Sequence, residues 1–172
     1  MKLFPNPKTL IFSKEKMNSQ KISKVTSSFD EHFNNLLYQM FEVNQKEGIP
    51  LMIEKSDDIT NYEGYKLKIE KEVITIIAKQ PNGAFYGLLT LRDILNSDNQ
   101  LCLEIEDYPD LAVRGVMLDI SRSKVPTLDT LKKLVVMFAT LRYNHLELYI
   151  EGFSFEYQSF KHLLSDNNYL CL

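Results

Sequence analysis

Long apolar runs and cysteines are both scarce in this sequence, and each shortage excludes a class of protein. No apolar stretch approaches the roughly 20 residues that a membrane-spanning helix needs. The opening MKLFPNPKTLIFSKEK has no apolar core of signal-peptide length before its lysines. Cys102 and Cys171 are the only cysteines, too few for a disulfide-stapled secreted scaffold, and we predict that both are free thiols. We therefore expect a cytoplasmic protein with no membrane partner.

A surplus of charge of one sign is also absent. The chain has 20 basic and 23 acidic residues, interspersed, so no basic stripe marks a nucleic-acid partner. His145 has no Cys, Asp or Glu at metal-ligand spacing, and the spacing of Gly83 and Gly87 fits no nucleotide-binding fingerprint. The sequence therefore predicts neither a metal nor a cofactor. Its composition is otherwise ordinary: 44% of the 172 residues are hydrophobic, enough for the core of one domain or two small ones.

The first part of the chain alternates between strand and helix patterns. A short apolar run at 9–12 predicts a strand, and apolar residues at three- and four-residue steps between Phe29 and Phe41 predict a helix with Ser27 or Ser28 as its N-cap. Three strand patterns follow in IPLMIEKS and YEGYKLKIEKEVITIIAKQ, and PNGAFYGLLTLRDILNS then predicts a turn and a second helix. This order predicts a small α/β domain whose helices cover one side of a mostly antiparallel sheet.

The pattern changes at CLEIEDYPDL, where Asp107, Pro109 and Asp110 predict a connector. AVRGVMLDIS is nearly continuous in apolar residues, as are the strands of parallel sheets that are buried on both faces. A helix follows with Thr127 as its N-cap, and NHLELYIEGF then predicts another strand. Strand, helix and strand with short links form a βαβ unit, which we expect to be parallel and right-handed. One such unit cannot close a sheet, so it indicates the opening of a larger α/β fold.

Three motifs carry a resemblance to a known family. They are GAFYG-x-x-T-L-R, then DYPD shortly before RGVMLDISR, and finally LRYNHLELY. With these motifs the chain resembles the glycoside hydrolase family 20 β-N-acetylhexosaminidases from about Glu63 to Glu151, roughly half of its length. The resemblance implies that residues 1–108 form the family's small N-terminal α/β domain. It also implies that residues 109–172 form the first βαβ segment of the family's catalytic (β/α)8 barrel (a TIM barrel), truncated in this chain.

The resemblance also implies an activity. Family 20 enzymes remove terminal N-acetylhexosamine from glycans with retention, and the substrate's own acetamido oxygen is the nucleophile. An Asp-Glu pair at the end of the fourth barrel strand supplies the general acid/base and orients the acetamido group. The only Asp-Glu dipeptide of this chain is Asp30-Glu31, in the first turn of a predicted helix. We therefore expect no catalytic residue here and no activity of the chain alone. The alternative is a non-catalytic module that binds a glycan or a partner chain.

Three residues are candidates for contact with substrate. Arg114 matches the arginine at the family's first barrel strand, whose guanidinium donates to sugar hydroxyls; a paired arginine at a strand start is the alternative. Arg114 lies early in its strand, whereas barrel active sites lie at the C-terminal ends of strands, so its side chain would have to reach up. Asp119 is the second candidate, and the alternative is that it forms an ion pair with Arg122 that shapes the barrel mouth. Glu151 is the third, as a substrate-side or supporting carboxylate on the same rim.

An unfinished barrel also has consequences for the surface. If the chain is a fragment, it exposes apolar side chains along 113–120 and along the helix at 131–141. Such a surface allows the chain to self-associate. The aromatic tail FSFEYQSF either stacks on sugar or is core displaced from its packing.

Overall fold

The computed structural model of this chain describes residues 3–44, 46–121 and 125–151. Contacts between Cα atoms divide the chain into two compact units, Met1–Asp110 and Leu111–Leu172. Within the described residues the first unit holds six strands and two helices, and the second holds two strands and one helix. The domain boundary predicted from the sequence, after residue 108, lies two residues before the division between these units.

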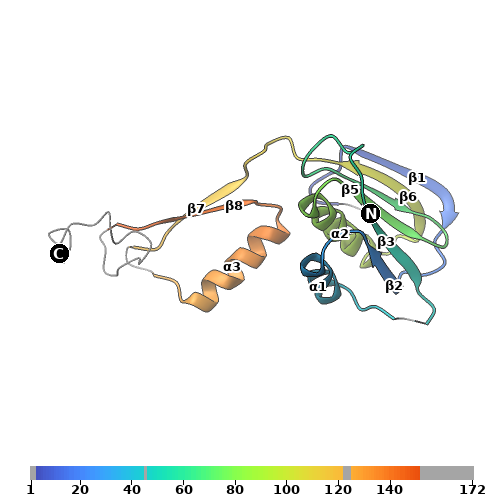
Figure 1. Ribbon diagram of the computed structural model, residues 1–172, viewed down its shortest axis with the longest axis horizontal. Coiled ribbons are helices and arrows are strands. Elements are labelled where there is room, and N and C mark those ends of the chain that lie inside the picture. Colours follow the sequence, from blue (N-terminus) through green and yellow to red (C-terminus); the bar gives the residue numbers. More distant parts are fainter. Residues whose placement is uncertain (1–2, 45, 122–124, 152–172) are drawn as a thin grey trace. The chain divides into compact units, whose positions relative to one another are not determined.

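The first unit is built on a mixed sheet (Figure 1). Its strands are β1 (Thr9–Lys16), β2 (Ile22–Ser27), β3 (Ile49–Lys55), β4 (Tyr65–Ile69), β5 (Ile74–Ala78) and β6 (Leu101–Asp107). They lie in the order β1-β6-β4-β5-β3-β2. The pairs β1–β6, β6–β4 and β4–β5 are antiparallel, whereas β5–β3 and β3–β2 are parallel.

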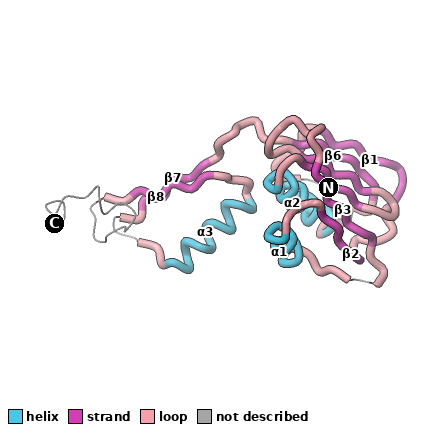
Figure 2. The backbone as a smooth tube through the Cα atoms, in the orientation of Figure 1, coloured by secondary structure: helices cyan, strands magenta, loops and turns pink. Residues whose placement is uncertain are grey.

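Two helices lie on one side of this sheet, as the sequence predicted (Figure 2). They are α1 (Glu31–Met40) and α2 (Pro81–Leu95). α2 contacts β4 and β5, and α1 contacts α2. Every second residue of β4 is buried (Tyr65, Leu67 and Ile69), whereas Lys66 and Lys68 between them are not, because successive strand side chains point to opposite faces. The core therefore lies between the helices and one face of the sheet.

Gly83, in the first turn of α2, lies against backbone rather than against side chains. Pro81 occupies the start of the helix, where its missing N–H costs nothing. A Cβ atom added at Gly83 would lie 2.3 Å from the carbonyl oxygen of Gly64, closer than any real contact allows. Glycine at this position therefore sets how closely α2 approaches the segment before β4.

Three sequence expectations for the first unit need correction. β2 and β6 were not predicted as strands. The N-cap of α1 is Asp30, whose Oδ1 accepts a hydrogen bond from the N–H of Phe33 at 2.9 Å; the predicted cap at Ser27 or Ser28 is wrong. Ser27 instead ends β2, where it pairs in register with Ile53. The first strand also runs to Lys16, four residues beyond the predicted end, because β1 continues past an irregularity in its pairing with β6.

The second unit is a parallel βαβ arrangement, as predicted. It consists of β7 (Gly115–Asp119), α3 (Leu128–Thr140) and β8 (His145–Tyr149). β7 and β8 are parallel, with Gly115 opposite His145 and Asp119 opposite Tyr149. Thr127 caps α3 as predicted, because its side chain accepts a hydrogen bond from the N–H of Thr130.

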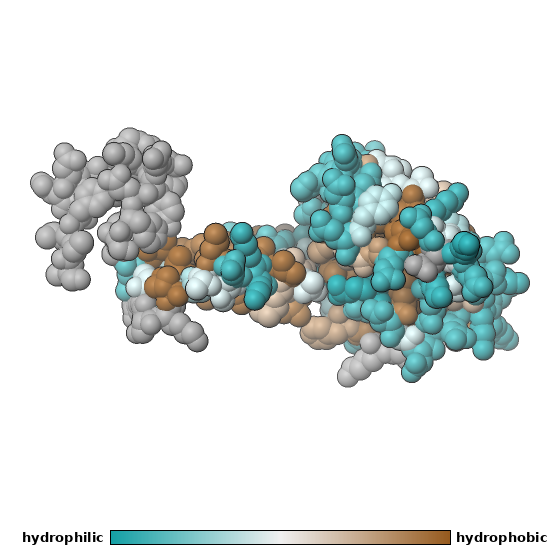
Figure 3. Space-filling model, turned by 90° about the horizontal axis from the view of Figure 1, so that it is seen from below, coloured by the Kyte–Doolittle hydropathy of each residue, from teal (hydrophilic) through white to brown (hydrophobic). Residues whose placement is uncertain are grey.

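The second unit has no fully buried side chain among its described residues. β7 has the apolar sequence of a strand that is buried on both faces of a complete parallel sheet. Within the described residues it pairs only with β8, and its residues are exposed or half-buried, in line with the apolar exposure expected along 113–120. Val113, Met117 and Val136 are 68%, 59% and 64% exposed. Figure 3 shows hydrophobic side chains gathered on the surface of this unit, whereas the view of the first unit is mostly hydrophilic.

No helix in the described part of the chain is both long and apolar enough to span a membrane.

Candidate functional site

The C-terminal ends of β7 and β8 bring two of the three candidate residues to one edge. Asp119 is the last residue of β7 and lies opposite Tyr149, the last residue of β8. The N–H of Ile120 donates to the carbonyl oxygen of Tyr149 at 3.0 Å, which ties the two ends together. The hydroxyl of Tyr149 donates to Oε1 of Glu151 at 2.8 Å. Two carboxylates therefore share the edge at which parallel α/β units carry their sites.

Asp119 is engaged with the residue that follows the strand. Its Oδ1 accepts hydrogen bonds from the N–H of Ser121 at 2.9 Å and from the Ser121 hydroxyl at 2.6 Å. This local pattern ends the strand and fixes the carboxylate. Arg122, the partner predicted from the sequence, lies outside the described residues.

Arg114 lies at the opposite end of β7. Its Nε donates to the carbonyl oxygen of Arg142 at 2.8 Å, and its Nη1 donates to that of Leu111 at 2.7 Å. Its N–H donates to Oδ1 of Asn144 at 2.9 Å, and its carbonyl oxygen accepts from the N–H of Asn144 at 2.9 Å. Here the guanidinium therefore holds the turns before β7 and β8, and the structure does not bring it together with Asp119 or Glu151.

The Asp30-Glu31 dipeptide has a structural position. Asp30 caps α1 in the first unit, and Glu31 is exposed in the first turn, where the helix dipole favours a carboxylate. Neither residue belongs to the second unit, which carries Asp119 and Glu151. No group of three or more His, Cys, Asp and Glu side chains that could hold a metal ion occurs within 3–44, 46–121 and 125–151.

A buried polar network in the first unit was not found by reasoning from the sequence. Tyr65 Oη lies 2.6 Å from Thr90 Oγ1 and 3.4 Å from Asp107 Oδ2, and all three residues are buried. The hydroxyl of Tyr86 donates to Oε1 of Glu63 at 3.1 Å. Buried polar groups need hydrogen-bond partners, and here each finds its partner on a different element. The contacts therefore link α2 to β4, to the residue Glu63 before it, and to β6. The periodicity of the strands marks these positions as inward-facing but does not show which of them meet.

Lys8 and Cys102, both in the first unit, have displaced pKa values. The hydrogen bond to Asp110 raises the pKa of the Lys8 ammonium above its usual 10.5. Burial raises the pKa of the Cys102 thiol, and the nearby carboxylates of Glu15 and Glu70 raise it further. Cys102 is a free thiol, as predicted, and it is buried. It lines a pocket of about 220 Å³ together with Glu15 and Glu70. Cys171 lies outside the described residues.

Comparison with solved structures gives the class of protein. The chain is similar to the β-N-acetylhexosaminidase from Bacteroides fragilis, with a TM-score of 0.71 and 22% identity over 87% of this chain and 33% of that chain. It is also similar to the exo-β-N-acetylglucosaminidase from Vibrio harveyi, with a TM-score of 0.75 and 23% identity over 94% of this chain and 28% of that chain. The two units therefore have the α/β fold of family 20 enzymes, whose catalytic domain is a TIM barrel.

Sequence comparison then gives the family. The family model described as glycosyl hydrolase family 20, domain 2, matches residues 1–108. This chain belongs to glycoside hydrolase family 20, which confirms the resemblance seen in its motifs. It is 33% identical over 99 residues to a β-hexosaminidase of Porphyromonas gingivalis, covering 51% of this chain and 13% of that protein. It is 28% identical over 116 residues to a β-hexosaminidase of Akkermansia muciniphila, covering 63% and 23%. The chain spans less than a quarter of the length of these two relatives.

Proposed function

We propose that this chain is the N-terminal portion of a retaining exo-β-N-acetylhexosaminidase that acts on glycans ending in N-acetylhexosamine. The observation that carries the proposal is the order of its parts: a family 20 domain 2 at 1–108, followed by a parallel βαβ unit. The β-hexosaminidases to which the chain is similar are several times longer than the shared region. The remaining length of such an enzyme would supply the other barrel strands and the catalytic pair.

The chemistry we propose for the whole enzyme needs little from these residues. The acetamido oxygen of the substrate attacks the anomeric carbon, and a general acid gives its proton to the departing glycosidic oxygen. Water then attacks the anomeric carbon, displaces the acetamido oxygen and gives one of its protons to the same group. The two successive inversions at the anomeric carbon retain the configuration. Asp119 and Glu151, at the C-terminal edge of β7 and β8, would contribute to the rim of that site.

Arg114 has two possible roles that an experiment can separate. As a sugar ligand it would donate hydrogen bonds to hydroxyls in addition to those that it donates to the carbonyls of Leu111 and Arg142, because a guanidinium has five N–H donors. As a structural residue it keeps these carbonyl partners. An Arg114→Lys variant of the whole enzyme raises KM with little loss of stability in the first case, and it lowers stability with KM unchanged in the second.

A chromogenic assay tests the proposal directly. The purified chain is incubated with 4-nitrophenyl N-acetyl-β-glucosaminide and with the corresponding galactosaminide, and the Vibrio harveyi enzyme serves as the positive control. We expect no release of nitrophenol by this chain. A chimera in which the chain replaces the matching segment of the Porphyromonas gingivalis protein should fold and hydrolyse the substrate. Turnover by the chain alone that is lost in Arg114→Ala, or a folded chimera without turnover, would contradict the proposal.

A further inference from the structure

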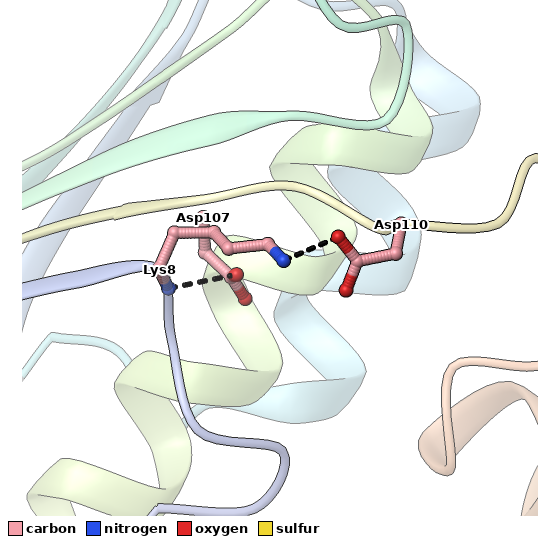
Figure 4. A network of polar contacts seen from close by, with 3 residues as sticks. All are labelled: Lys8, Asp107 and Asp110. Carbon is pink, nitrogen blue, oxygen red and sulfur yellow. Dashed lines mark hydrogen bonds and ion pairs between the residues drawn. The ribbon is translucent and has the colours of Figure 1, made fainter.

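Lys8 contacts three of the four residues at which the chain leaves the first unit. It directly precedes β1, and its backbone N–H donates to Oδ1 of Asp107 at 3.3 Å. Its ammonium pairs with the carboxylate of Asp110, and Figure 4 shows both contacts of Lys8 with the two aspartates. The ammonium also lies 5.4 Å from the centre of the Tyr108 ring. One side chain at the start of the sheet therefore touches a segment about 100 residues later in the sequence.

Asp107 provides a fixed base for these contacts. It is the last residue of β6, opposite Tyr65 of β4, and only 6% of its surface is exposed. Its Oδ2 lies 3.4 Å from the Tyr65 hydroxyl, which in turn lies 2.6 Å from the hydroxyl of Thr90 in α2. Asp107 is thus anchored to the core of the first unit before the chain continues.

The far end of the connector (residues 108–113) is held by the second unit, because the carbonyl oxygens of Leu111 and Ala112 accept hydrogen bonds from Nη1 of Arg114 and Nδ2 of Asn144. The pairings of β6 with β1 and β4 end at Glu106 and Asp107. Beyond that point the side chain of Asp110 is 78% exposed, and its ion pair with Lys8 reaches back to the first unit. An exposed ion pair adds little to global stability, so its effect is confined to the segment that it holds.

We propose that Lys8 is a positioning residue for the connector: it clamps Tyr108 and Asp110 back onto the first unit and thereby fixes the direction in which the chain leaves that unit. The Lys8 ammonium can serve both residues at once, since it pairs with a carboxylate and lies over an aromatic face. A lysine is charged at neutral pH, and the hydrogen bond to Asp110 raises the pKa of Lys8, so at alkaline pH the clamp persists beyond the ordinary range of lysine.

The absence of tryptophan from the chain allows a site-specific test. Tyr108→Trp places the only tryptophan on the connector, in the position that the Lys8 ammonium faces. Lys8→Met is made in this background, and Lys8→Arg restores the charge. Lys66→Met is the matched control, because Lys66 makes a similarly exposed ion pair with Glu106 of β6 at 3.6 Å. Acrylamide quenching and the anisotropy decay of the tryptophan report its local mobility.

We expect Lys8→Met to raise the quenching rate constant about twofold and to add a fast component to the anisotropy decay. Lys8→Arg and Lys66→Met should match the parent, and the urea midpoint measured by circular dichroism should change little in all variants. Equal quenching in Lys8→Met and the parent, or the same rise in Lys66→Met, would overturn the proposal.

A measurement without tryptophan guards against failure of the Tyr108→Trp parent to fold. Backbone ¹⁵N relaxation in the otherwise unchanged sequence compares the wild type with Lys8→Met. Order parameters at Tyr108 and Asp110 should fall in the variant, whereas those in β4 should not. Unchanged order parameters at both residues would contradict the clamp.

Discussion

The fold alters the chemistry of Cys102. It lies on β6, where alternation places it on the same face as Glu104, away from the helices. Burial raises the pKa of its thiol, and the carboxylates of Glu15 and Glu70 raise it further, so folding favours the protonated form. Since the thiolate is the reactive species, the folded protein should protect Cys102 from modification.

We predict that the rate constant for reaction of Cys102 with a disulfide reagent at about pH 8 is at least about tenfold lower in the folded protein than in urea. The reaction is followed in a Cys171→Ser variant, so that only Cys102 contributes. Glu15→Gln should accelerate the folded-state reaction, because it removes one negative charge from the pocket. Glu54→Gln, an exposed change outside that pocket, should leave the rate unchanged. A folded protein that reacts as fast as the unfolded chain would show the thiol to be accessible.

The sign of the pH effect on stability follows from the same shift. The folded protein holds the Cys102 proton more tightly than the unfolded chain, whose thiol titrates at its usual 9.0. The stability that this proton contributes is therefore complete below about pH 9 and is lost as the pH rises through the folded-state pKa.

Single residues were the hardest features to predict from the sequence. The family motifs identified Arg114, Asp119 and Glu151 as candidates, and strand alternation predicts which side chains face inward. Neither kind of information shows that Arg114 donates to the carbonyls of Leu111 and Arg142, because those contacts depend on turns whose geometry the sequence leaves open. Lys8 was missed for a similar reason. Its partner Asp107 is 99 residues away, and no local pattern links them.

Among the elements, α2 depends most directly on one small residue. The gap between Gly83 and the carbonyl oxygen of Gly64 is too short for a Cβ atom, and the obstacle is backbone that cannot rotate away. Alanine has the higher intrinsic helix propensity, by about 1 kcal/mol, so propensity alone predicts that Gly83→Ala stabilises the protein. The close approach reverses this expectation, because crowding in a packed core costs about 1–3 kcal/mol and occasionally more.

We predict that Gly83→Ala lowers the free energy of unfolding by about 1–3 kcal/mol, measured by urea denaturation followed at 222 nm. Asn82→Ala is the control, since Asn82 is exposed in the same turn of α2 and its change should have a small effect. An increase in stability from Gly83→Ala would mean that α2 does not pack closely against Gly64.

The elements that sequence patterns predicted share strong local signals. α1, α2 and α3 have apolar residues at helical spacing, and Thr127 is a good N-cap in the position expected. β2 was missed because only one face of ISKVTS is apolar, and that face only weakly. The strand is stabilised by its parallel pairing with β3, which is distant in sequence. β6 was missed because Asp107 at its end, and Pro109 and Asp110 just beyond it, suggested a connector. Tertiary pairing decided both segments, and the local sequence did not reveal it.

At the scale of the whole molecule, the two units differ in how completely they bury their apolar residues. The first unit buries alternate residues of β3, β4, β5 and β6 beneath its helices. The described part of the second unit buries none fully, and α3 exposes Val135, Val136 and Met137. Both the family and the exposed apolar surface could be predicted from the sequence, since the motifs span both units and one βαβ unit cannot cover its own faces.

The exposed surface of the second unit leads to a prediction about the chain in solution. Contiguous apolar surface favours association, because water is released when two such faces meet. We expect sedimentation equilibrium at micromolar concentration to give an average mass above the 20.0 kDa of one chain. Val136→Lys replaces a side chain that is 64% exposed on α3, and it should weaken association about tenfold, since burying a valine contributes about 1.5 kcal/mol or more.

Gln39→Lys is the control for this variant. It adds the same charge at an exposed site on α1 of the first unit and should leave the average mass unchanged. A wild-type chain that sediments as a single 20.0 kDa species and binds no hydrophobic dye would show that this surface is covered in solution.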